Sequence, residues 1–296
     1  MTEAPISPAE AGRSGIAIRT ESLTKIYGTN RALDSLSVQI ESGTVCGLIG
    51  PNGAGKSTLM SILATLLRPT SGSAEIFGIP LTDTEAIRPI IGYVPDVLGM
   101  YSGLTVQEYL DFFAEAYRLP RDTRGATIEG LLELVDLSSK RYADVNTLSR
   151  GMKQRIGLAR GLIHQPRLLI LDEPASGLDP RARIELRDII NHLRELGMTV
   201  LISSHILGEL EEMCTHGLIV EQGRLVGFES LADEPTRSVE VRLLDGSTKR
   251  FEVPDLAAQR DLIRSLIHEG FEVVAVTEVS TRLEDRFLRL TEGQVN

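Results

Sequence analysis

The 296-residue sequence predicts an α/β fold built on a mostly parallel, doubly wound sheet. Short apolar runs alternate with amphipathic patterns of helical period along most of the chain. Two of these runs, residues 44–49 and 168–171, are apolar throughout, as in strands that are buried on both faces of a sheet. Polar residues follow several runs directly, and ligands of such sheets bind at the carboxyl ends of strands.

Composition limits the classes of function. Lys and Arg number 31 against 41 Asp and Glu, a net charge of −10, so we expect no broad basic surface and no nucleic-acid partner. The two cysteines, Cys46 and Cys214, form no metal or disulfide pattern and are expected in the core. No apolar run approaches the roughly 18 residues of a membrane span, and the start lacks the regions of a signal peptide. A cytoplasmic protein is predicted.

The first segments lead toward a buried strand. Residues 1–15 are rich in small and turn-forming residues and are expected to be a flexible tail. Residues 16–19 and 36–40 alternate in polarity and predict antiparallel strands before the strand at 44–49. Tyr27 is expected in the loop between them, where its ring could stack on a base or simply pack against the protein.

A glycine-rich segment follows that strand. It reads Gly50-Pro51-Asn52-Gly53-Ala54-Gly55-Lys56-Ser57-Thr58 and matches the phosphate-binding pattern G-x-x-x-x-G-K-[ST]. Apolar residues at helical spacing over 59–67 place a helix behind it, so backbone N–H groups and the positive helix end would meet a polyphosphate. Lys56 would bridge the β- and γ-phosphates, and the Ser57 hydroxyl would ligate Mg²⁺. The alternative, a turn that binds nothing, is disfavoured by the correct flanking elements.

The middle of the chain predicts a helical region at about residues 97–165. Strands at 73–77 and 90–94 precede it, and Pro95 and Asp96 end the second strand. Thr105 and Glu108 form a capping-box pattern before an amphipathic run that reaches residue 117. A further helix is expected at 127–135, and Ser149 stands just before another over 152–163.

Two carboxylates end the strand at 168–171. Asp172 and Glu173 are adjacent, and burial of both requires a nearby cation, which a Mg²⁺ held by Ser57 and a nucleotide would supply. The alternative is a solvated strand end. A helix over 181–195 and a strand over 199–202 follow, and the strand is closed by Ser203, Ser204 and His205.

Five motifs in this order resemble the ATP-binding subunit of an ABC transporter over about residues 16–231. They are residues 50–57, 148–154, 168–173, 176–179 and His205. The signature at 148–154 separates this family from kinases and GTPases, which share only the loop and the acidic strand. The resemblance implies a P-loop ABC ATPase fold in residues 16–232, with antiparallel strands and an inserted helical subdomain, and it implies ATP and Mg²⁺ as ligands.

The resemblance also assigns roles to single residues. Tyr27 would stack on adenine, and Lys56, Ser57 and Thr58 would hold phosphate and Mg²⁺. Asp172 would support the metal through water, Glu173 would act as general base, and His205 would contact the γ-phosphate. These roles agree with phosphoryl-transfer chemistry, which depends on positioning and charge stabilisation.

The resemblance further implies a dimer. Each ATP would lie between the phosphate loop of one subunit and Ser149 and Gly151 of the other, with Asp179 near the dimer axis. Because one chain carries one cassette, the partner would be a second copy or a paralogous ATP-binding subunit. A transmembrane permease subunit is the other expected partner, which places the chain on the inner face of the cell membrane.

The chain departs from the family pattern at three positions. Arg150 and Met152 replace a glycine and a glutamine of the signature, and we expect phosphate contact to survive because Ser149 and Gly151 are kept. Asp96 replaces a glutamine that in relatives touches Mg²⁺ and couples to the membrane subunit. A shorter, charged side chain there is expected to reach the metal through water and to alter the coupling geometry.

The pattern changes after residue 232, and residues 233–296 predict a small α+β unit. Strands are expected at 239–243 and 248–253 around an Asp245-Gly246 hairpin turn, followed by a helix over 257–267 and a strand over 273–276. Residues 283–290 are similar to the ending of exporter-type cassettes that work with separately encoded membrane subunits. The unit would support or regulate a dimer, or would be a packing appendage.

The function predicted from these features is ATP hydrolysis that drives export of a drug, lipid or polysaccharide through a separate transmembrane subunit. The alternative is a soluble ABC ATPase acting on ribosomes or DNA, whose relatives carry tandem cassettes, long coiled coils or zinc cysteines that this chain lacks. A P-loop kinase is a third possibility, but it would give no reason for the signature at 148–154.

Overall fold

The computed structural model describes residues 15–231 and 237–279. Contacts divide the chain into two units, Met1–Ser230 and Leu231–Asn296. Both the tail predicted at the N-terminus, apart from Gly15, and the segment 283–290 lie outside the described residues.

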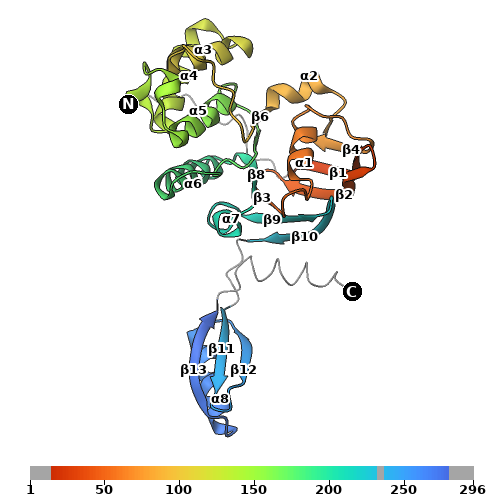
Figure 1. The fold of residues 1–296 in the computed structure, drawn as a ribbon, viewed down its shortest axis with the longest axis vertical. Helices are drawn as coiled ribbons and strands as arrows, with labels where there is room; N and C mark the ends of the chain where they lie inside the picture. The colour runs from red at the N-terminus through yellow and green to blue at the C-terminus, as the bar shows by residue number, and fades with distance from the viewer. Residues whose placement is uncertain (1–14, 232–236, 280–296) are drawn as a thin grey trace. The chain divides into compact units, whose positions relative to one another are not determined.

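A six-stranded sheet forms the centre of the larger unit, in the order β10-β9-β3-β8-β7-β6 (Figure 1). Its strands are β3 (Val45–Ile49), β6 (Ile91–Val94), β7 (Leu168–Leu171), β8 (Thr199–Ser204), β9 (His216–Glu221) and β10 (Arg224–Ser230). All neighbours pair in parallel except β10, which is antiparallel to β9. The mostly parallel sheet predicted from the apolar runs is therefore confirmed.

The register of this sheet brings three strand ends together. Ile49 of β3 pairs with Ser204 of β8, and Leu171 of β7 pairs with Ile202 of β8. The segments that begin at Gly50, Asp172 and His205 consequently leave the sheet side by side, as expected for the carboxyl edge of parallel strands.

A second, four-stranded antiparallel sheet has the order β2-β1-β4-β5. It consists of β1 (Ile16–Tyr27), β2 (Asn30–Glu41), β4 (Ser71–Ile76) and β5 (Ile79–Pro80). The first two strands are longer than predicted, because irregular register near Leu23 and Lys25 lets pairing continue past the break in polarity. Tyr27 is accordingly the last residue of β1, and its placement in a loop was wrong.

The main hydrophobic core lies around α1 (Lys56–Leu63), and it takes buried side chains from strands of both sheets. Cys46 belongs to this core and Cys214 is also buried and free, as predicted; burial raises the pKa of the Cys46 thiol to about 12. The predicted helix over 59–67 is too long. Thr65 has a left-handed backbone (φ 59°), which ends the helix and leaves Leu66 65% exposed.

The remaining helices of this unit are α2 (Thr84–Ile87), α3 (Val106–Ala116), α4 (Arg121–Leu134), α5 (Arg150–Leu162), α6 (Pro180–Glu195) and α7 (Leu207–Met213). Short 3₁₀ helices occur at Arg88–Ile90, Ser138–Lys140 and Val145–Thr147. In Figure 1, α3, α4 and α5 gather on one side of the unit, away from α1.

Caps define these helices. The capping box of Thr105 and Glu108 is present, and Ser149 caps α5 by accepting from the Met152 N–H, as predicted. The helix expected at 127–135 begins earlier, with Pro120 as its N-cap residue. Proline is tolerated at the start of a helix, because the N–H that it lacks would have no partner there.

A stacked pair of rings joins α3 to the end of α5. The Tyr117 ring lies 3.8 Å from the imidazole of His164 with their planes 5° apart. His164 Nε2 lies 2.7 Å from the carbonyl oxygen of Ile91, the first residue of β6. This contact ties the helical group to the edge of the parallel sheet.

The smaller unit contains β11 (Arg237–Leu243), β12 (Thr248–Val253), α8 (Leu256–His268) and β13 (Val273–Val279). The strands form an antiparallel sheet in the order β12-β11-β13, and its core includes Val241, Leu243 and Leu266. Strand, hairpin, helix and strand occur in the order predicted, with β11 and α8 each two residues longer and β13 three residues longer.

Within residues 15–231 and 237–279, no helix is both long and apolar enough to span a lipid bilayer.

Candidate active site

The three strand ends open onto a cleft of about 520 Å³. Its lining comes from the end of β1, the start of β2, the loop before α1, and the segments after β6, β7 and β8. The lining residues are Tyr27, Asn30, Ala32, Pro51, Asn52, Gly53, Ala54, Gly55, Lys56, Ser57, Thr58, Asp96, Glu173, Ser176 and His205.

The loop before α1 is shaped for an anion. No side chain caps α1, so the N–H groups of its first turn are available to a ligand. Gly55 has a φ of 107°, and a Cβ there would lie 2.4 Å from the carbonyl oxygen of Ala32, so only glycine fits. Lys56 is 7% exposed, and its Nζ donates to the carbonyl oxygens of Gly50 (2.7 Å) and Pro51 (3.3 Å).

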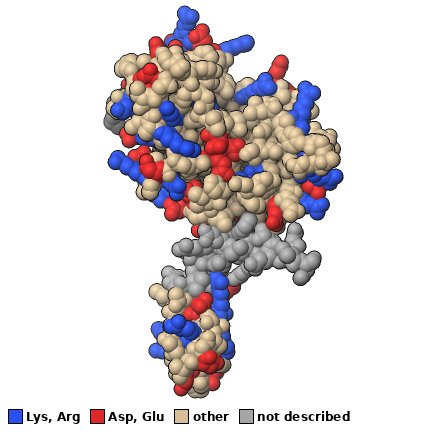
Figure 2. All heavy atoms as spheres, viewed as in Figure 1, with Lys and Arg blue, Asp and Glu red and all other residues tan. Residues whose placement is uncertain are grey.

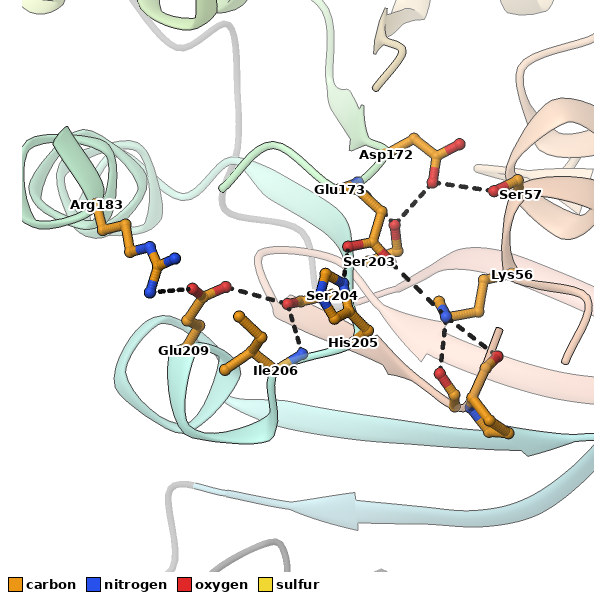
Figure 3. Close-up of polar contacts among 12 residues, drawn as sticks. Lys56, Ser57, Asp172, Glu173, Arg183, Ser203, Ser204, His205, Ile206 and Glu209 are labelled. Carbon is orange, nitrogen blue, oxygen red and sulfur yellow. Dashed lines mark hydrogen bonds and ion pairs between the residues drawn. The ribbon is translucent and has the colours of Figure 1, made fainter. Parts of the chain in front are cut away.

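Asp172 directly follows β7 and is only 5% exposed. Its Oδ1 accepts from the hydroxyls of Ser57 (3.3 Å) and Ser203 (2.8 Å) (Figure 3). A hydroxyl and a carboxylate are hard oxygen donors of the kind that Mg²⁺ prefers. Among the described residues, no group of three or more His, Cys, Asp or Glu side chains could hold a metal ion by itself, so a cation here would need phosphate oxygens as well.

Glu173 connects the phosphate loop to the end of β8. One carboxylate oxygen, Oε1, lies 3.7 Å from Lys56 Nζ, and the other, Oε2, lies 2.7 Å from His205 Nδ1. The backbone of Glu173 has a φ of 49°, a left-handed conformation that is strained for a non-glycine residue. Such strain is typical of functional sites, where the surrounding structure holds a side chain in place.

Behind His205, a second polar chain runs outward to α6 (Figure 3). The Ser204 hydroxyl donates to Glu209 Oε2 (3.1 Å) and accepts from the Ile206 N–H (3.0 Å). Glu209 Oε1 forms an ion pair with Arg183 Nη1 at 3.1 Å. The geometry of this contact is not that of a hydrogen bond. The loop that carries His205 is thereby linked to both α7 and α6.

One aromatic ring is part of the cleft lining. Tyr27 is 48% exposed on the cleft, and Lys25 Nζ lies 5.1 Å from its ring centroid. Asn30 and Ala32 also line the cleft and were not predicted, because they lie outside any motif and reach the cleft only through the turn between β1 and β2.

Asp96 is exposed and lines the cleft, so the position that departs from the family pattern does face the site. Tyr93, on the strand that precedes it, lies nearby. Burial raises the pKa of Tyr93, and the negative charges of Asp172 and Asp96 raise it further, so its phenol stays neutral.

The cleft does not include all predicted site residues. Ser149, Gly151 and Asp179 are absent from its lining and lie near the starts of α5 and α6. Gly50 and Asp172 are also absent from the lining, although they adjoin residues that belong to it. A Cβ on Gly151 would lie 2.7 Å from the Cβ of Ala182, and a Cβ on Gly177 would lie 2.6 Å from the guanidinium carbon of Arg150. Arg150 thus fills space over the turn that leads to Asp179.

Charge on the larger unit is mixed. On the face drawn in Figure 2, acidic side chains gather near the middle, and Lys and Arg side chains are scattered around them. Lys56 is the basic residue of the cleft lining, against Asp96 and Glu173. A polyanion bound there needs the loop amides and a cation in addition to Lys56.

A glycine-rich loop before a helix that no side chain caps, a buried carboxylate at a neighbouring strand end and a strained glutamate beside it define a nucleoside-triphosphatase of the phosphate-binding-loop class. Comparison with known proteins then places the chain within that class. A family model described as ABC transporter matches residues 33–176. The bacitracin transport ATP-binding protein BcrA of Bacillus licheniformis is 35% identical over 93% of this chain and 97% of its own length. The chain belongs to the ABC transporter family, as an ATP-binding subunit.

Two further relatives fit this assignment. The Nod factor export ATP-binding protein I of Rhizobium meliloti is 40% identical over 71% of this chain and 63% of its own length. A dimeric ATP-binding cassette, solved in a post-hydrolysis state bound to ADP and Pi, is 25% identical with a TM-score of 0.67, covering 73% of this chain and 100% of that one. The protein is therefore an ATPase whose fold binds ATP and ADP, and the predicted family and fold class are confirmed.

Proposed function

We propose that this chain hydrolyses ATP to drive export through a separate transmembrane subunit. The observation that carries the proposal is the position of Glu173, whose carboxylate contacts Lys56 of the phosphate loop on one side and His205 on the other, at the edge of the cleft. A carboxylate held there is suited to a water molecule that attacks a phosphate bound to the loop.

Binding of ATP uses the whole cleft. The triphosphate lies on the backbone N–H groups of residues 52–58, and Lys56 exchanges the carbonyl oxygens of Gly50 and Pro51 for β- and γ-phosphate oxygens. The adenine base stacks on Tyr27, whose ring is half exposed in the cleft lining.

Mg²⁺ fits the oxygen donors of Ser57 and Asp172, and when bound it neutralises charge on the phosphates. Ser57 and Asp172 would hold the ion through their hydroxyl and carboxylate oxygens. Asp96, which lines the same cleft, would add a further carboxylate near it.

Hydrolysis then follows from the geometry of Glu173. Its carboxylate accepts a proton from water as the water oxygen bonds to the γ-phosphorus, and the bond from that phosphorus to the bridging oxygen breaks. ADP leaves with the electron pair, and inorganic phosphate is the other product. His205 orients Glu173 through the 2.7 Å contact and donates to the γ-phosphate with its other ring nitrogen.

Two chains act together in this proposal. Ser149, Gly151 and Asp179 lie outside the cleft of their own chain, near the exposed starts of α5 and α6. They serve the ATP of a partner, with the N-terminus of α5 directed at its γ-phosphate. The partner is a second copy or a paralogous ATP-binding subunit.

The domain roles are part of the proposal. Residues 16–232 form the ATP-binding domain, with residues 97–165 as its helical subdomain. Residues 233–296 form an accessory unit. The boundary between the domain and the accessory unit is supported by the division of contacts after Ser230. The chain lies on the inner face of the cell membrane, bound to its permease. Relatives named for bacitracin transport and Nod factor export support export of a drug, lipid or polysaccharide.

The test is to tag the Glu173→Gln form, solubilise membranes of its native cells in mild detergent with ATP, and identify what co-purifies. A multi-spanning protein in roughly equal amount supports the transporter. Recovery of ribosomal or DNA-bound proteins alone would contradict it and favour a non-transport ABC ATPase.

A further inference from the structure

Ser203 lies at the end of β8, and its side chain is completely buried. Its hydroxyl makes two hydrogen bonds, both to the segment that follows β7. It donates to Asp172 Oδ1 at 2.8 Å and accepts from the backbone N–H of Glu173 at 2.9 Å. One hydroxyl thus contacts both members of the acidic pair.

These two bonds use the one proton of the hydroxyl and one of its two lone pairs. A serine hydroxyl has one proton, which goes to Asp172, and a lone pair then faces the Glu173 N–H. The peptide between the two acids is consequently fixed in orientation. Glu173 needs such a restraint, because its φ of 49° is unfavourable for a residue with a Cβ.

A second residue near the end of β8 also contacts Glu173. His205, two residues after Ser203, contacts the Glu173 carboxylate, so backbone and side chain of the acid are both anchored to one segment. Ser204 has a different role, since its hydroxyl bonds to Glu209 and to the Ile206 N–H on the other side of the strand. The two adjacent serines are therefore not interchangeable.

We propose that Ser203 is a positioning residue for ATP hydrolysis, which orients Asp172 toward the metal and holds Glu173 in its strained conformation. The inference rests on the proposed roles of these two acids. Ser203 is buried and is not among the residues that line the cleft, so it acts on the rate through Glu173 and on Mg²⁺ through Asp172.

Replacement by alanine leaves two buried groups, the Asp172 oxygen and the Glu173 N–H, with weaker or no partners. We expect Ser203→Ala to lower kcat for ATP hydrolysis about tenfold, with KM for ATP changed less than about twofold. The Mg²⁺ concentration for half-maximal rate should rise about threefold or more, because a hydrogen bond to a metal-binding carboxylate orients it and tunes its affinity for the metal.

A matched control exists on the same strand. Thr199 at the start of β8 is 1% exposed, and its hydroxyl accepts from the Gly43 N–H at 2.9 Å, far along the strand from the acids. Thr199→Val also deletes a buried hydroxyl that serves a backbone N–H, but it should leave kcat and the Mg²⁺ requirement unchanged. Thermal unfolding of both variants measures the stability effect that they share.

The steady-state parameters and Mg²⁺ titrations of wild type, Ser203→Ala and Thr199→Val are measured beside Glu173→Gln. Wild-type kcat in Ser203→Ala, or an equal loss in Thr199→Val, would overturn the inference. If Ser203→Ala does not fold, Ser203→Cys keeps a weaker donor of similar size, and an unchanged kcat there would overturn the inference as well. Full activity in Glu173→Gln would instead refute the proposed base, so the two failures are distinguishable.

Discussion

Lys56 Nζ lies 3.7 Å from Oε1 of Glu173, so the lysine of the phosphate loop and the acid at the end of β7 form an ion pair across the cleft. Lys56 also donates to two loop carbonyls. In the proposed mechanism, an incoming phosphate competes for the same ammonium and frees one oxygen of Glu173 toward the cleft. Binding of ATP and freeing of the proposed base are therefore linked through one side chain.

Lys56→Ala should weaken ATP binding itself. Loss of the ammonium removes a charge-assisted contact to the phosphates and leaves Glu173 without its cation, so we expect Kd for ATP to rise at least about tenfold. Equilibrium binding of a fluorescent ATP analogue measures this. Lys140→Ala, an exposed change in a short 3₁₀ helix, is the control and should keep the wild-type Kd. Equal affinity in the two variants would refute the role of Lys56.

Glu173→Gln should keep ATP binding while hydrolysis falls by about a hundredfold or more, because the amide cannot accept the proton of water. The amide keeps the size of the side chain and can still meet His205. Phosphate release under saturating ATP is the measurement, with the exposed Glu129→Gln as control. Hydrolysis at the wild-type rate would remove Glu173 from the role of base.

Tyr27→Ala should raise KM for ATP about tenfold with little change in kcat, since stacking contributes roughly 1–3 kcal/mol and acts on binding. Tyr27→Trp keeps an aromatic face and should stay within about twofold of wild type. Tyr142, which is 75% exposed and outside the cleft lining, provides the control Tyr142→Ala. If Tyr27→Ala has the wild-type KM, Tyr27 only packs against the protein.

The stacked His164 predicts a pH dependence of stability. Burial lowers the pKa of His164 below its usual 6.5 in the folded chain. The unfolded chain then binds the proton more readily, so the contribution to the free energy of unfolding is complete above about pH 6.5 and is lost as pH falls through the lowered pKa.

His164→Phe keeps a ring against Tyr117 but does not titrate, so its stability should fall less between pH 7 and pH 5 than that of wild type. Urea unfolding at a series of pH values measures the slopes. The more exposed His192→Gln should keep the wild-type slope. An identical slope in His164→Phe would show that the pH dependence arises elsewhere.

The parts of the site that were predictable are contiguous in sequence. The segment from Gly50 to Thr58 and the pair Asp172 and Glu173 each follow an apolar run, and the parallel register of β3, β8 and β7 brings them together. The family comparison confirms the fold that these segments predict. The individual roles of the residues stay predictions.

Other features depend on three-dimensional detail. The apolar period of α1 continues to Leu67, but a left-handed Thr65 ends the helix earlier, and periodicity carries no signal of a backbone angle. Ser203 and Ser204 are alike in sequence, yet strand pleating sends their hydroxyls to different partners. Arg150 packs over Gly177 only because α5 and the segment before α6 are neighbours.

In the proposed function, two chains enclose ATP, with the signature segment of each facing the phosphate loop of the other. This arrangement is tested by the molar mass of Glu173→Gln in solution by light scattering, with and without Mg²⁺ and ATP. We expect a mass that doubles when both are present and returns to that of one chain when they are removed. A mass that stays at one chain with ATP saturating would contradict it.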